Sequence, residues 1–141
     1  MNGTRRPIRD NLVAIVSLAV ALSALGYNTW RNERTERNRN IRVAGIEMLR
    51  EIGSLQRVVL YRHYAEEDVR GDPHTGWAEV YMIGDLAALM PADVTRDARG
   101  LRIAWEANVE DLVENQEAFE RIDNAIDVLR RTTLAELGAL R

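Results

Sequence analysis

Residues 11–30 read NLVAIVSLAVALSALGYNTW and contain no charged side chain. A helix of this length extends about 30 Å, which is the thickness of the hydrocarbon core of a bilayer. Tyr27 and Trp30 stand near its end, and aromatic rings at such positions favour the headgroup region of a membrane. The stretch therefore predicts a single N-terminal transmembrane helix, preceded by a short basic tail, residues 1–10.

Two other structures can contain an apolar stretch of this kind. A cleaved signal peptide also has a basic start, and Ala19–Ala21 and Ala21–Ser23 resemble cleavage triplets. Helix-compatible composition, however, continues past both triplets to residue 69 without a proline, whereas turn-prone residues usually lie near a cleavage site. A buried core helix is disfavoured because a chain of 141 residues could hardly cover a helix that is apolar all round. We therefore expect a retained anchor.

Arginines flank the apolar stretch on both sides and leave its orientation open. Three precede it, and five follow within twelve residues, which by the positive-inside rule favours a cytoplasmic C-terminal domain. Exporting a short tail with three arginines is unfavourable, and this cost favours a periplasmic C-terminal domain. We expect a single-pass protein of the inner membrane and lean to the periplasmic side for the domain that follows the span.

Charge divides the chain in the same way. Residues 1–42 hold eight arginines and three acids, a net charge of +5, whereas residues 43–141 hold eleven arginines and nineteen acids, a net charge of −8. An acidic body is repelled by the phosphates of nucleic acids, so we expect no nucleic-acid partner. The lipid bilayer is the first expected partner, and the basic segment beside the span can touch anionic headgroups.

The polar stretch after the span predicts a solvated helix. Residues 31–40, RNERTERNRN, contain no apolar side chain, and Glu33 and Arg37 have the favourable order for an ion pair one helical turn apart. We interpret this segment as a polar helical stalk that continues the membrane helix. Residues 41–141 then form an acidic helical bundle domain.

Turn-forming residues mark the ends of the first helix and of a second one. The first helix should end near Val69, because the turn sequence RGDP follows it. A second helix is expected over 76–90, with Asp72 or Thr75 as its N-cap and Pro91 as its stop.

A polar link, residues 92–99, is expected to lead into a third helical region from about 96 to 138. This region is either one long helix or two helices broken near Asn115 and Gln116. The predicted fold is thus all-α: a transmembrane helix continues into a stalk and then into a three- to four-helix antiparallel bundle or a long helical hairpin.

Apolar residues of the bundle domain recur at intervals of three, four and seven, the spacing of a helix-packing seam. Asn108 and Asn115 lie on the same seam, where they could either fix the register between chains or mark a helix break. The predicted seam residues are Ile41, Met48, Ile52, Leu55, Val59, Trp105, Leu112, Phe119, Ile122, Ile126 and Leu129.

Residues able to support chemistry are few. Cysteine and lysine are both absent, which excludes disulfides, thiolate metal sites and Schiff-base catalysis. His63 and Glu67 share a helix face, and His74 could supply a third ligand, so these three are the weak candidates for a metal site. Exposure at the end of a solvated helix is the favoured explanation of these residues, so we expect no metal site. We expect no enzyme activity and no cofactor.

Association between chains is the better-supported activity. Small residues at intervals of three and four let helices approach closely in lipid, and Ala14, Ser17, Ala21 and Ala24 form such a face within the span. We therefore hypothesise a non-catalytic, membrane-anchored helical protein that acts through protein–protein contacts, as a homo-oligomer or with another membrane protein.

The alternative is a membrane-tethered sensory bundle that works with a separate signalling partner. It predicts a ligand pocket between helices, near Tyr64, Trp77 and Trp105.

Overall fold

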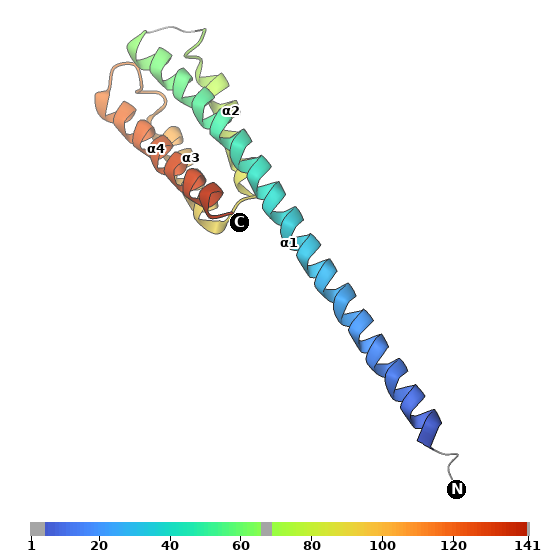
Figure 1. Ribbon diagram of the computed structural model, residues 1–141. Coiled ribbons are helices and arrows are strands. Elements are labelled where there is room, and N and C mark those ends of the chain that lie inside the picture. The colour runs from blue at the N-terminus through green and yellow to red at the C-terminus, as the bar shows by residue number, and fades with distance from the viewer. Residues whose placement is uncertain (1–4, 66–68, 141) are drawn as a thin grey trace. The chain divides into compact units, whose positions relative to one another are not determined.

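All the regular secondary structure among the described residues is α-helical. A computed structural model describes residues 5–65 and 69–140, with side chains from residue 11 onward. It contains four helices: α1 (Arg5–Tyr64), α2 (Pro73–Ala87), α3 (Ala92–Asn108) and α4 (Gln116–Ala139) (Figure 1). The chain divides into two units, Met1–Arg37 and Asn38–Arg141. The predicted all-α fold is confirmed, and the bundle has four antiparallel helices rather than three or a single hairpin.

The first unit is built on the N-terminal part of α1. Among the described residues, α1 is the one helix that is long and apolar enough to cross a membrane, judged by length and composition. All side chains from residue 11 to residue 37 are exposed within the chain. This part of the helix therefore gains nothing from intramolecular packing.

The second unit is a four-helix bundle whose helices are held in antiparallel register. Along α1 and α4, the hydroxyl of Thr133 donates to Met48 Sδ over 3.4 Å, and Gln56 Nε2 donates to Asp123 Oδ1 over 3.2 Å. Further along, His63 Nε2 lies 3.0 Å from Gln116 Oε1. Residue numbers rise on α1 as they fall on α4, so the two helices run in opposite directions.

The predicted seam residues form the core of this bundle. Ten of the eleven are buried and the eleventh, Ile41, packs against the buried cluster from a partly exposed position. Trp105 is fully buried, and Gly76 of α2 leaves the space that its ring occupies, because a Cβ there would lie 2.3 Å from the ring. The apolar residues of the seam are therefore buried by other residues of the same chain.

The ends of α1 and α2 differ from the predicted ones by a few residues. α1 ends at Tyr64, five residues before the expected end at Val69, which lies in a turn. α2 begins at Pro73 instead of residue 76, because the Asp72 carboxylate accepts from the backbone N–H groups of His74 and Thr75. Of the two predicted caps, Asp72 is the correct one.

The end of α2 was predicted three residues too late. The helix ends at Ala87 instead of residue 90. The backbone N–H groups of Ala88, Leu89 and Met90 bond to carbonyls three residues earlier, which tightens the chain into a turn before Pro91.

The predicted polar link at 92–99 is wrong, since α3 already begins at Ala92. Val94 and Ala98 face the core and are buried, Arg96 between them is exposed, and Thr95 and Asp97 are partly buried. The Thr95 hydroxyl also donates to the carbonyl of Ala87 over 2.8 Å and joins this first turn of α3 to the end of α2.

The region 96–138 forms two helices, broken after Asn108. The Asn115 side chain accepts from the N–H groups of Glu117 and Ala118 and so caps α4. Asn108 donates to the carbonyl of Ala104 over 2.7 Å and accepts from Arg121 over 3.3 Å. The two seam asparagines therefore mark the helix break, one at each side of it.

Candidate functional site

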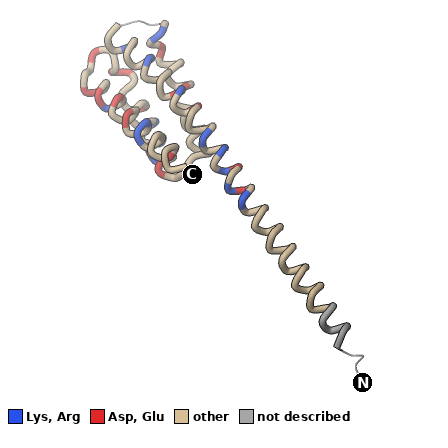
Figure 2. The backbone as a smooth tube through the Cα atoms, viewed as in Figure 1, with Lys and Arg blue, Asp and Glu red and all other residues tan. Residues whose placement is uncertain are grey.

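The exposed apolar part of α1 is the main candidate for a functional surface. Large apolar side chains from Leu12 to Trp30 are each more than half exposed. Soluble proteins rarely expose a continuous apolar patch of this size, and such patches are typical of contact surfaces for lipid or another protein. Figure 2 shows the uncharged stretch of α1, followed directly by positions that carry charge.

The end of this apolar stretch has the side chains expected at a membrane interface. The rings of Tyr27 and Trp30 lie 6.2 Å apart, and the guanidinium of Arg34 lies 5.6 Å from the centre of the Trp30 ring. The Thr29 hydroxyl donates to the carbonyl of Leu25 over 3.0 Å, so its polar atom is satisfied within the helix. Such internal pairing removes the cost of placing the hydroxyl near lipid.

The predicted association face lies on this same surface. Ala14, Ser17, Ala21 and Ala24 are all exposed within the chain. Their side chains are small, so the backbone of a neighbouring helix could approach α1 closely along this face.

The structure separates the two histidines of the predicted metal site. His63 Nδ1 lies 2.7 Å from the carbonyl oxygen of Leu112, and its ring stacks on Phe119 with the centroids 4.5 Å apart. His74 is almost fully exposed and contacts the Asp72 carboxylate over 3.1 Å. Glu67 lies outside the described residues. Within the described ranges, no three histidine, aspartate or glutamate side chains gather to hold a metal ion.

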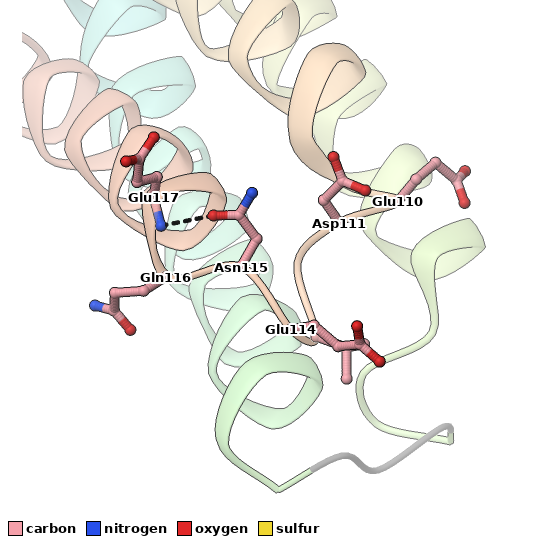
Figure 3. A pocket seen from close by; sticks show the side chains of 7 residues that line it. Glu110, Asp111, Glu114, Asn115, Gln116 and Glu117 are labelled. Atoms are coloured by element: carbon pink, nitrogen blue, oxygen red, sulfur yellow. Dashed lines mark hydrogen bonds between the residues drawn. The ribbon is translucent and has the colours of Figure 1, made fainter.

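An open hollow of about 910 Å³ lies at the connection between α3 and α4. Its carboxylates belong to Glu110, Asp111, Glu114 and Glu117, and in Figure 3 those of Glu110, Glu114 and Glu117 point apart. Asn115, the N-cap of α4, stands among them, and its side chain accepts from the N–H of Glu117 over 2.9 Å. The hollow is thus the acidic outer surface of a helix cap.

A carboxyl pair between α1 and α2 was not predicted from the sequence. Burial raises the pKa of Glu79 to about 7, with a further contribution from the hydrogen-bonded Glu51 carboxyl, while Arg57 acts in the opposite direction. The two glutamates are 28 positions apart in the sequence, and no local pattern connects them. Only the register between the two helices brings them together.

The aromatic residues expected around a ligand pocket belong to two separate groups. Trp77 meets the buried Trp105 edge-on, with ring centroids 6.4 Å apart, and stacks on Tyr81. Tyr64 instead contacts His63 and Phe119. The three residues named for the sensory alternative therefore do not face one shared space.

Comparison with protein families, with characterised proteins and with solved structures gave no match.

Proposed function

We propose that this chain is a non-catalytic, single-pass membrane protein that acts through protein–protein contact, by self-association within the inner membrane. The observation that carries the proposal is the exposure of residues 11–30 within the chain, in contrast to a bundle that packs its own core. Lipid covers an exposed apolar helix of this length most simply.

Self-association is assigned to the span because the seam of the bundle is already occupied. Met48, Ile52 and Val59 are fully buried within the chain, so a second copy cannot use them without unfolding the bundle. The small-residue face of the span has no such intramolecular partner. Two copies packed along this face would place Ser17 of one close to Ser17 of the other.

Disulfide trapping tests this proposal, because the chain contains no native cysteine. Ser17→Cys in the full chain, oxidised in native membranes, is expected to give a covalent dimer. The further change Ala21→Leu should abolish the dimer, since a bulky side chain keeps the helices apart.

Ala19→Leu is the matched control, because the same change lies on the opposite side of the helix and should leave the dimer intact. A monomer throughout, or a chain shortened by cleavage after residue 21 or 23, would contradict the proposal. Such a cleaved chain would have lost Ser17 itself.

A further inference from the structure

The part of α1 at and just after the end of the apolar stretch has a basic and aromatic face. Tyr27, Trp30, Arg31, Arg34 and Arg37 are all exposed within the chain. At about 100° per residue, these five positions fall within an arc of about 120° around the helix. One side of α1 therefore presents two aromatic rings and three guanidinium groups, and we call it the basic-aromatic face.

The two acidic residues of this segment lie outside the face. At about 100° per residue, Glu33 is about 40° beyond Arg37, at the edge of the face, and Glu36 is about 100° beyond Arg37. Both carboxylates are exposed. Three guanidinium groups against one carboxylate at the edge leave an excess of positive charge on this side of the helix.

The Trp30 ring positions one of the three guanidinium groups. The guanidinium of Arg34 lies over this ring, 5.6 Å from its centre, and the Tyr27 ring lies 6.2 Å from the Trp30 ring. A guanidinium that lies over a ring uses its planar face, so the N–H groups in its plane remain available to an acceptor. Arg34 is thus held in place and keeps its donors.

The other two guanidinium groups are also available. Neither Arg31 nor Arg37 makes a side-chain hydrogen bond or an ion pair with another residue that the structure describes. Arginines of the bundle do pair with carboxylates, as Arg121 does with Glu117 over 3.0 Å. The face therefore offers donors that the chain itself does not use.

An open hollow of about 440 Å³ lies on this part of α1. Its lining residues are Trp30, Glu33, Arg34 and Arg37. A phosphate group that enters it meets donors from two arginines beside an indole ring.

The height of the face matches the headgroup layer of a bilayer that contains residues 11–30. This layer extends about 5 to 7 Å beyond the hydrocarbon core. Arg31, Arg34 and Arg37 follow Trp30 by about 1.5, 6 and 10 Å along the helix axis. Side chains on a helix tilt toward its N-terminus, which in α1 is the direction of the apolar stretch, so the long arginine side chains reach back to the headgroups.

We propose that the basic-aromatic face binds the phosphate group of an anionic phospholipid from the same bilayer. This inference rests on the proposed function, because a membrane-spanning α1 brings the face to the headgroup layer. The guanidinium groups donate to the phosphate oxygens in charge-assisted hydrogen bonds. The rings of Tyr27 and Trp30 lie beside them, at the boundary between headgroups and acyl chains.

An anionic lipid fits this face better than other occupants. A zwitterionic headgroup balances its phosphate with an ammonium group, so it neutralises little of the positive charge of the face. An acidic protein would complement the charge, but the face continues directly from the exposed apolar surface of the span, which the proposed function places in lipid. Charge and position together therefore select an anionic lipid.

Native mass spectrometry of the full chain tests the proposal, because the mass of a bound lipid identifies its headgroup. The chain, in micelles of a neutral detergent, is supplied with equal amounts of phosphatidylglycerol and phosphatidylcholine. We expect it to retain phosphatidylglycerol preferentially. Replacing Arg31, Arg34 and Arg37 together by glutamine should reduce this preference by about fivefold or more, since one charge near an anionic surface contributes about fivefold.

Two further variants separate the face from the total charge. Arg34→Gln combined with Asn32→Arg keeps the net charge but moves one arginine about 160° around α1, and it should reduce the preference by about fivefold. Replacing the exposed bundle residues Arg99, Arg102 and Arg131 by glutamine removes three charges elsewhere and should leave the preference unchanged. Glutamine and arginine are similar helix formers, so neither variant should unfold the helices.

Three results would overturn this inference while the Ser17→Cys dimer keeps the proposed function intact. The first is equal retention of the two lipids, or an equal loss of preference in the bundle variant. The second is displacement of phosphatidylglycerol by excess glycerol phosphate, which would assign the face to a free phosphate ester. The third is retention of neither lipid, which would point to an acidic protein. A chain cleaved after residue 21 or 23 would overturn both proposals, since it would have no membrane span.

Discussion

Glu79 shows how the bundle places a single titratable side chain. Its pKa is raised from 4.5 to about 7, first by burial and then by the Glu51 carboxyl. Between these two pH values, the folded chain holds a proton that the unfolded chain releases. The free energy of unfolding should therefore fall as the pH rises from about 4.5 to about 7.

Glu79→Gln should remove this part of the pH dependence. Glutamine stays neutral and can still hydrogen-bond to Glu51, so the variant should match the parent near pH 4.5 and be more stable at pH 8. The gain is about 1 kcal/mol, because the pair is only partly buried and solvent screens it. Urea unfolding at both pH values measures it. Glu106→Gln, an exposed control, should follow the parent, and a parallel course for Glu79→Gln would contradict the assignment.

Some residue contacts could not have been read from the sequence. The sequence spacing of His63 and His74 allows them to share a metal ion, but α1 ends at Tyr64 and His74 lies in the first turn of α2, beyond a turn of the chain. His63 instead contacts Leu112 and Gln116, about fifty positions away. Contacts of this kind depend on the register between helices, which local spacing does not encode.

At the scale of the element, apolar spacing predicts that a helix exists better than it predicts where the helix ends. The seam residues of α1, α3 and α4 recur at three- and four-residue intervals, and all of them except Ile41 are buried. The start of a helix depends on a single N-cap residue, such as Asp72 for α2 or Asn115 for α4. Several residues near each of them could also have acted as the N-cap. The first turn of α3 was missed because its polar residues outnumber Val94 and Ala98.

Asn115→Ala tests the break between α3 and α4. It removes the acceptor for the N–H groups of Glu117 and Ala118, so it should lower the free energy of unfolding by about 1 kcal/mol. Urea unfolding measures the change. Asn115→Asp, which keeps an N-cap oxygen, should retain most of the stability. An unaffected alanine variant would argue against a cap at this position.

At the scale of the whole molecule, the chain combines two units with opposite needs. The bundle satisfies its apolar side chains internally, and its seam is closed within one copy. In the apolar part of α1, the large apolar side chains are more than half exposed, because no other described part of the chain packs against them. Composition and charge differ between these two parts of the chain, so the sequence alone distinguishes them. The burial of the seam within one copy could be seen only in the structure.

The central claim is that residues 11–30 lie within a bilayer. Because the chain has no cysteine, single cysteines can replace Val13, Val20, Leu25, Glu33 and Arg37 in turn. Each full-length variant is placed in lipid nanodiscs, where both faces are open to a membrane-impermeant maleimide, and its rate of labelling is measured. We predict slow labelling at 13, 20 and 25 and fast labelling at 33 and 37. Equal rates at all five positions would contradict the account.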